Sequence, residues 1–321
     1  MKRRWAGLVP ALLAVSAGLV LAVCGTGPSA HDEAPGYARE DGVPRVRDEK
    51  DLPALPLDRY EFSGREQQRI EEALARVTQR CMRSHGFEDF PLHPGWGTKM
   101  AASFNLVAIS VSPYGTLDLA HARRWGYGLD PALLEEQRDG PGNQGRVPTD
   151  AERRVLDGTG GRGGRAEVVG GREVPEGGCE ALAARRLLQD EKAARQRSFV
   201  PERVEKLDKA VAADQRVRRA FRDWSRCMAG KGFTSYESPA AAAGDKAWFR
   251  GRQDGNTART EKELATAVAD VECNRALNTA GVRWAVSAEK QRAELRAHKG
   301  RYEAVRAHLD RVRAIVREEL D

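Results

Sequence analysis

One eight-residue motif occurs twice in the chain, and each copy is followed by a single further cysteine. Residues 80–87 read RCMRSHGF and residues 226–233 read RCMAGKGF. The later cysteines, Cys179 and Cys273, begin or occupy segments with the pattern of a helix. If these four cysteines are paired, two long connections are closed covalently. This constrains the fold more than any other feature of the sequence.

The methionine, glycine and phenylalanine of the motif have the spacing of a helix end. A glycine just past a helix adopts the left-handed backbone without Cβ strain, and apolar residues four before it and one after it close the end. We therefore expect two helix ends of the Schellman type, formed by Met82, Gly86 and Phe87 in the first copy and by Met228, Gly232 and Phe233 in the second.

Capping does not require the cysteine of the motif. In an exported chain, four cysteines remaining after the signal most simply form two disulfides, and three pairings are open. The repeat favours Cys81 with Cys179 and Cys227 with Cys273, so that each bond joins a helix end to a later helix.

The N-terminus has the pattern of an export signal. The basic start MKRRW precedes an uncharged apolar run from Ala6 to Val23, and residues 1–24 are therefore assigned to the signal. The sequence LAVCG at its end resembles a lipobox, in which Cys24 would carry lipid, although Val23 departs from the small residue normal there. Cleavage nearby and an uncleaved anchor are the alternatives. Either way we expect an exported chain, secreted or held at the outer face of the membrane.

The rest of the chain divides into three parts. Residues 25–58 are rich in proline, glycine and charge, which predicts a disordered tether. We expect residues 59–198 to form a first helical unit with a long Gly-rich loop at 140–178, and residues 199–321 to form a second helical unit that ends in a long heptad-patterned helix.

Helix start signals predict a mostly α fold. Capping-box patterns occur at Ser63 to Glu66, Thr149 to Glu152 and Thr260 to Glu263. Each should begin a helix, and the first should run to about His85.

The C-terminal third has heptad periodicity, with Leu295, Tyr302, Leu309 and Val316 seven residues apart. Residues 260–321 lack proline, and a single helix of this length would extend well beyond a compact body. We expect either a break near Gly281 and Gly300 or a long antiparallel hairpin packed against the helix that contains residues 204–224.

Basic residues repeat every seven positions beside this apolar stripe, at Arg292, Lys299, Arg306 and Arg313. Long basic side chains in such places usually cover apolar surface and keep their charge in water. The alternative is contact with an anionic lipid or cell-wall polymer.

Charge elsewhere excludes a nucleic-acid-binding protein. The formal net charge is +6, of which Lys2, Arg3 and Arg4 in the signal supply three, and the 53 basic and 47 acidic residues are interspersed.

The sequence contains no recognisable catalytic, cofactor or metal site. Gly158, Gly160 and Gly163 have a dinucleotide-loop spacing, but no helix follows them. Cys81 and His85 could begin a metal site, yet the second copy has lysine where the first has His85. We expect no cofactor and no metal.

Several of these segments together resemble a family of uncharacterised secreted or lipoprotein-like proteins of high-GC actinobacteria. The segments are the two CMxxxGF copies, WGYG at 125–128, the Thr149 helix ending at Gly158, GGCEALAARRLL at 177–188 and VADVEC at 268–273. The resemblance implies export and an α-helical body, but no activity. The chain departs from it at Leu188 and in the lipobox.

We therefore expect a non-catalytic cell-envelope protein that binds a protein partner or a cell-wall component, with an oligomeric state that the sequence leaves open. One alternative is an envelope-acting hydrolase or modifying enzyme with a site assembled near His121, Trp125 and Tyr127. The other is a structural spacer.

Overall fold

The computed structural model describes residues 34–95, 112–128, 130, 132, 145–160, 164–165, 168–188, 191–248 and 259–321. The chain separates into two units, Met1–Asp32 and Glu33–Asp321, and all described residues belong to the second. No helix in these ranges is both long enough and apolar enough to span a bilayer.

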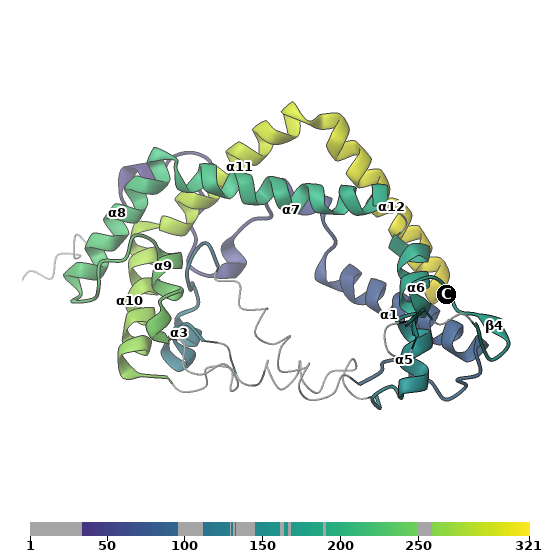
Figure 1. The fold of residues 1–321 in the computed structure, drawn as a ribbon. Helices are drawn as coiled ribbons and strands as arrows, with labels where there is room; N and C mark the ends of the chain where they lie inside the picture. Colours follow the sequence, from purple (N-terminus) through teal and green to yellow (C-terminus); the bar gives the residue numbers. More distant parts are fainter. Residues whose placement is uncertain are drawn as a thin grey trace, which may run out of the picture. The chain divides into compact units, whose positions relative to one another are not determined.

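The described chain is mostly helical (Figure 1). Its α-helices are α1 (Gly64–Ser84), α3 (Leu119–Trp125), α5 (Asp150–Leu156), α6 (Gly178–Leu188), α7 (Glu191–Ala212), α8 (Gln215–Gly230), α9 (Pro239–Ala243), α10 (Glu261–Leu277), α11 (Thr279–Ala297) and α12 (Lys299–Leu320). Its 3-10 helices are η1 (Gly36–Ala38), η2 (Glu49–Asp51), η3 (Asp58–Tyr60) and η6 (Lys246–Trp248). The mostly α fold class is confirmed.

Among the described residues, extended structure is confined to two short antiparallel pairs within the predicted Gly-rich loop. Strand β1 (Thr159–Gly160) pairs with β2 (Gly164–Arg165), and β3 (Val168–Val169) pairs with β4 (Arg172–Glu173). The second pair lies against the end of α1, because a Cβ on Gly170 would fall 2.6 Å from the carbonyl oxygen of His85.

Three helices begin where the capping patterns place them. The Ser63 and Thr149 side chains accept hydrogen bonds from the backbone N–H groups of Glu66 and Glu152, and each glutamate carboxylate accepts one in return from the cap backbone. The Thr260 side chain accepts a bond from the N–H of Glu263. These bonds satisfy amides that a helix start leaves without partners.

Both copies of the repeated motif end a helix in the same way. The N–H groups of Phe87 and Phe233 donate to the carbonyls of Met82 and Met228, five residues earlier. The two motif glycines donate to the carbonyl three residues before them and have φ values of +91° and +86°. This is the hydrogen-bond pattern of the Schellman motif.

Each motif cysteine is joined to the cysteine that follows it. The Cys81–Cys179 bond connects α1 to α6, and the Cys227–Cys273 bond connects α8 to α10. The within-repeat pairing is therefore confirmed. The motif methionines are fully buried beside these bonds, each in its own hydrophobic cluster.

The structure differs from the predicted tether in the range 34–58. Ala34, Ala38, Val46 and Leu57 are buried in this segment. Its backbone also makes hydrogen bonds with side chains of the C-terminal helices, including that of Leu57 N–H to Gln291 Oε1 (3.0 Å). A proline-rich segment leaves many backbone groups unpaired, so polar side chains on a neighbouring helix can hold it without regular secondary structure.

The C-terminal region breaks twice, forming α10, α11 and α12 rather than one helix. The first break is at Asn278, which is left-handed (φ +52°), and the second is at His298, so each lies a few residues before the predicted glycine. Gly281 has a different role, because a Cβ there would lie 2.2 Å from the carbonyl oxygen of Pro44. The absence of a side chain lets the 34–58 segment approach α11.

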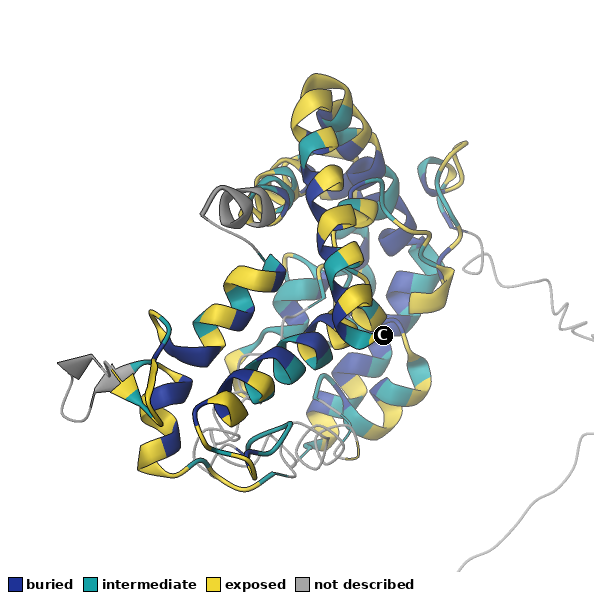
Figure 2. Ribbon diagram, turned by 90° about the vertical axis from the view of Figure 1, so that its right-hand side faces the viewer, coloured by how far each residue is buried: buried dark blue, intermediate teal, exposed yellow. Residues whose placement is uncertain are grey.

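Three of the four residues of the predicted apolar stripe are buried along α12, whereas Leu295 lies on α11 and is partly buried. Figure 2 shows buried and exposed positions alternating along the helix that leads to the C-terminus. Tyr302, Leu309 and Val316 are all nearly inaccessible to solvent. Helix α12 packs against α1, α6 and α7, whereas α11 packs against α7 and α8.

The predicted boundary at residue 198 does not divide the described chain. It falls within α7, which continues unbroken to Ala212. Helix α3 from the first predicted unit packs on α10 of the second, and α12 of the second packs on α1 of the first. The two disulfide-joined parts therefore share elements across the predicted boundary.

The second helix end provides a matched pair of glycine substitutions. A Cβ at Gly230 or Gly232 meets no atom within 4 Å, but only Gly232 has positive φ. We expect Gly232→Ala to lower the free energy of unfolding by about 1 kcal/mol and Gly230→Ala, at the last residue of α8, to leave it unchanged or raise it by up to about 0.5 kcal/mol. Denaturant unfolding of both variants measures this. A loss of the same size for both would show that backbone handedness does not decide the helix end.

Candidate functional site

In the part of the chain that the structure describes, the residues of the enzymatic alternative are each bonded to a different partner. His121 Nε2 lies 2.7 Å from the carbonyl oxygen of Gly128, and the carbonyl of Trp125 accepts a hydrogen bond from Arg259 Nε at 2.6 Å. Tyr127 O–H donates elsewhere, to Asp270 Oδ2 at 3.3 Å. Each polar group is thus engaged with a different part of the chain.

Asp270 on α10 is the centre of a buried polar cluster. Its Oδ1 accepts hydrogen bonds from Trp224 Nε1 (2.9 Å) and Asn274 Nδ2 (3.2 Å), and Tyr127 O–H binds the other oxygen. Burial raises the pKa of Asp270 well above its usual range, and these donors, with the Thr116 N–H, act in the opposite direction. The carboxyl group joins α8, α10 and the turn after α3.

Glu263, two turns earlier on α10, explains the glycine before Tyr127. Its buried Oε1 accepts the Tyr127 N–H at 3.3 Å and lies 3.8 Å from Arg259 Nε. A Cβ on Gly126 would lie 2.8 Å from the same oxygen, and Gly126 has positive φ. The WGYG segment is therefore a close turn around the acids of α10, and its role is structural. The sequence singled out the WGYG segment and placed Glu263 in a capping-box pattern, but it gave no sign that Glu263 and Asp270 would contact this segment.

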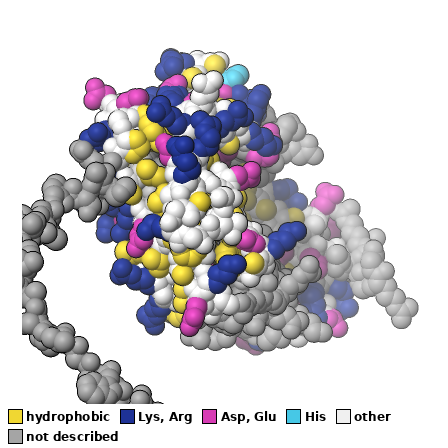
Figure 3. All heavy atoms as spheres, turned by 90° about the vertical axis from the view of Figure 1, so that its left-hand side faces the viewer, with side chains coloured by type: hydrophobic (Ala, Val, Ile, Leu, Met, Phe, Trp, Pro, Cys, Tyr) yellow, Lys and Arg dark blue, Asp and Glu magenta, His cyan; other side chains and the backbone are white. Residues whose placement is uncertain are grey.

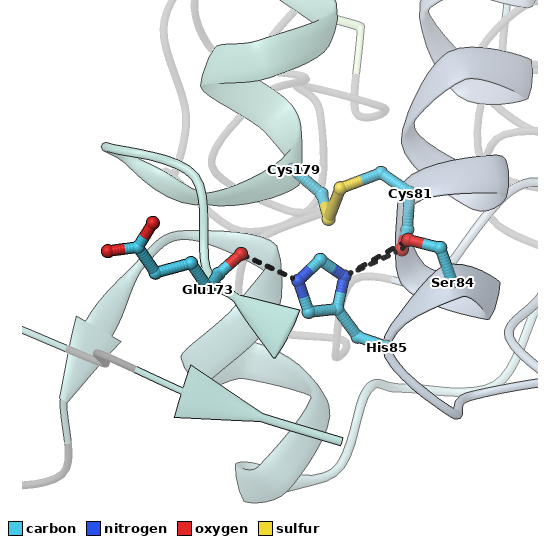
Figure 4. The surroundings of a disulfide bond; sticks show 5 residues. All are labelled: Cys81, Ser84, His85, Glu173 and Cys179. Carbon is cyan, nitrogen blue, oxygen red and sulfur yellow. Dashed lines mark hydrogen bonds between the residues drawn. A yellow bond between two sulfur atoms is a disulfide. The ribbon is translucent and has the colours of Figure 1, made fainter. Parts of the chain in front are cut away.

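The group Cys81, His85 and Cys179 has ligand atoms within 4.8 Å of one another (Figure 4). The two sulfur atoms are bonded to each other, whereas a metal requires a thiolate. His85 Nδ1 lies 2.9 Å from the carbonyl oxygen of Cys81, and Nε2 lies 3.1 Å from that of Glu173. His85 thus connects the end of α1 to strand β4.

One groove of the surface lies where η3 meets the junction of α11 and α12. It has a volume of about 310 Å³. Its polar lining consists of Arg59, Tyr60, Arg296, Lys299, Glu303 and Arg306. We call this set the basic groove.

Buried contacts hold the two walls of the basic groove together. The rings of Tyr60 and Tyr302 have centroids 4.9 Å apart, and Tyr302 O–H donates to Glu294 Oε1 at 3.3 Å. Glu294 also receives two bonds from Arg203 of α7, both 2.6 Å long. The wall that carries Arg59 is therefore fixed against α12.

The cations of the basic groove are largely available to a ligand. Arg59, Arg296 and Arg306 are exposed and have no carboxylate partner among the described residues. Lys299 lies 3.8 Å from Glu303, which is the only acid of the lining, and both are exposed. Such a cluster attracts anions, because the positive charges repel one another until an anion lies between them.

Two helix ends meet at the basic groove and have opposite effects on this potential. The dipole at the start of α12, whose first turn contains no acid, favours an anion beside Lys299. The carbonyl end of α11, one residue before, opposes it.

Another cavity, of about 450 Å³, lies along α8 and includes Arg218, Phe221, Arg222 and Glu237. Figure 3 shows this side of the molecule, where basic, acidic and hydrophobic side chains are mixed rather than gathered by charge. It is a weaker candidate for an anion than the basic groove.

The heptad of basic residues is divided by the fold. Lys299 and Arg306 line the basic groove, whereas Arg313 donates to Glu66 at 2.7 Å and Arg292 lies outside the groove lining. Arg59 and Arg296 were not predicted, because nothing in a heptad pattern shows that η3 packs beside α12.

Comparison of the chain with protein-family models, with curated proteins and with solved structures finds no match.

The Asp270 cluster generates a stability prediction. Asp270→Asn replaces one acceptor oxygen with an NH₂ group, which cannot accept the hydrogen bonds that this oxygen accepts. A buried donor then loses its partner, so we expect the free energy of unfolding to fall by about 1 to 3 kcal/mol. Glu272→Gln is the matched control, because it alters only the surface pair with Lys231 and should cost less than about 1 kcal/mol. Thermal or denaturant unfolding of both variants provides the measurement. Equal effects would contradict a central role for Asp270.

Proposed function

We propose that this chain is a non-catalytic cell-envelope protein that binds phosphate groups of an envelope polymer or lipid through the basic groove. The observation that carries the proposal is the set of three exposed arginines, Arg59, Arg296 and Arg306, which share one groove without carboxylate partners among the described residues. Arginine binds phosphate oxygens through paired N–H donors, and lysine adds a point charge.

The proposed location rests on two features. Residues 1–24 have the pattern of an export signal, and two disulfides are typical of an oxidising compartment outside the cytoplasm. In that compartment the accessible phosphates belong to wall polymers and lipid headgroups rather than to nucleic acid.

Binding is favoured over the two alternatives for specific reasons. A hydrolase would require reactive groups in an accessible pocket, and His121, Trp125 and Tyr127 are each engaged in the packing around α10. A spacer would not require exposed arginines to gather at one groove, since like charges placed together cost free energy.

The lipobox-like sequence suggests how the protein is held. We propose that Cys24, which lies outside the described residues, carries a diacylglycerol group and becomes the first residue of the mature chain. Intact mass of the protein from its own host should show lipid on Cys24, and Cys24→Ser should remove it and release the protein from membranes. An unmodified mature chain beginning elsewhere would contradict the anchor while leaving export intact.

The basic groove can be tested with two sources of phosphate. Soluble poly(glycerol phosphate) and vesicles of phosphatidylglycerol distinguish polymer from lipid, and phosphatidylcholine vesicles are the neutral reference. We expect Arg306→Gln to weaken binding to the preferred source about 5-fold, or about 1 kcal/mol. The slope of log affinity against log salt should also become shallower by about 0.7, because fewer counterions are released.

Arg222→Gln is the matched control for this binding measurement. Arg222 is an exposed arginine on α8, without a carboxylate partner in the described chain, and the substitution removes the same charge from the other cavity. It should leave affinity nearly unchanged. Equal losses for the two variants, or no binding to either phosphate source, would overturn the basic groove as the functional site.

A further inference from the structure

A second groove lies farther along α12 and shares no lining residue with the basic groove. This second groove has a volume of about 220 Å³ and lies between the start of α1 and the C-terminal half of α12. Its lining includes Phe62, Glu66, Arg69, Arg313 and Arg317. The segment that forms the opposite wall, residues 59–70, also forms the wall of the basic groove.

The charged residues that α12 contributes to the two grooves, together with Asp310 between them, lie on one face of the helix. They are separated alternately by four and three residues, which keeps them within a narrow sector of a helix. The series is Lys299, Glu303, Arg306, Asp310, Arg313 and Arg317. From Lys299 to Arg317 this face extends about 27 Å at 1.5 Å per residue.

Most acids on this path already have partners. Arg313 donates to Glu66 at 2.7 Å and to Asp310 at 2.9 Å, so that one arginine lies between two carboxylates. Glu303 lies near Lys299. Five exposed cations without a carboxylate partner in the described chain remain along the path: Arg59, Arg69, Arg296, Arg306 and Arg317.

Apolar side chains lie between these cations. Tyr60 and Leu295 contribute to the basic groove, and Phe62, Ile70 and Val316 contribute to the second. A surface with alternating cations and apolar patches matches a chain in which phosphates alternate with carbon units. A free phosphate ion could use the cations but not the apolar patches.

On the basis of the proposed function, we infer that the ligand is a linear polyanion with phosphodiester-linked units that lies along α12 and occupies both grooves at once. Binding in the first groove brings the next phosphates of the same chain close to the second. The second contact is then intramolecular, and the affinity for a long chain exceeds that for a short one without any new type of contact.

Chain length provides the test. Full-length protein is titrated with a dimer of glycerol phosphate and with a poly(glycerol phosphate) fraction of about ten units, with affinities expressed per phosphate. We expect the long fraction to bind at least about 10-fold more tightly, since linked contacts commonly raise affinity by a factor of about 100 or more.

Two substitutions assign the contacts. Arg306→Gln should weaken the binding of both fractions, whereas Arg317→Gln in the second groove should weaken only the long one. Arg222→Gln should affect neither. Arg306 and Arg317 are both exposed. Circular dichroism with thermal unfolding verifies that each variant is folded.

The outcomes separate this inference from the proposed function. Equal affinity per phosphate for the two fractions, or an Arg317→Gln variant that binds the long fraction normally, would overturn the two-groove path while leaving the basic groove in place. Absence of binding to either fraction, or losses that Arg222→Gln reproduces, would overturn both.

Discussion

The side chain of Asn278 holds together parts of the chain that are far apart in sequence. Its Nδ2 group donates to the carbonyls of Ala38 (2.9 Å) and Pro44 (3.0 Å), and its Oδ1 accepts the Val46 N–H at 3.0 Å. The same residue adopts the left-handed backbone that separates α10 from α11. Because asparagine tolerates this conformation better than most residues, one side chain both redirects the helix and binds the segment that crosses it.

The basic groove depends on this arrangement. Because the 34–58 segment is bound to α11, η3 lies at the start of α12, where the rings of Tyr60 and Tyr302 pack together. Arg59 then lies opposite Arg306 although the two are far apart in the sequence. The exposed Arg59 is therefore positioned by buried hydrogen bonds between uncharged groups.

Local signals in the sequence were sufficient for the helix starts, the two Schellman ends and the disulfide pairing, because each depends on residues with fixed short spacings or on the repeat. They were insufficient for the 34–58 segment, whose composition is that of a flexible chain and whose order comes from Asn278 and Gln291. The same limit applies to the candidate site. Lys299 and Arg306 could be read from the heptad, whereas Arg59 and Arg296 join them only through tertiary packing.

The two disulfides join neighbours in the order of the chain, Cys81 with Cys179 and then Cys227 with Cys273. For a polypeptide that crosses a membrane from its N-terminus, this order matters during synthesis. On the proposed export route, Cys179 is the first cysteine to follow Cys81, and their bond could close before Cys227 emerges. A strictly vectorial oxidant would therefore produce the native connectivity directly, with little demand on an isomerase to exchange wrong pairs.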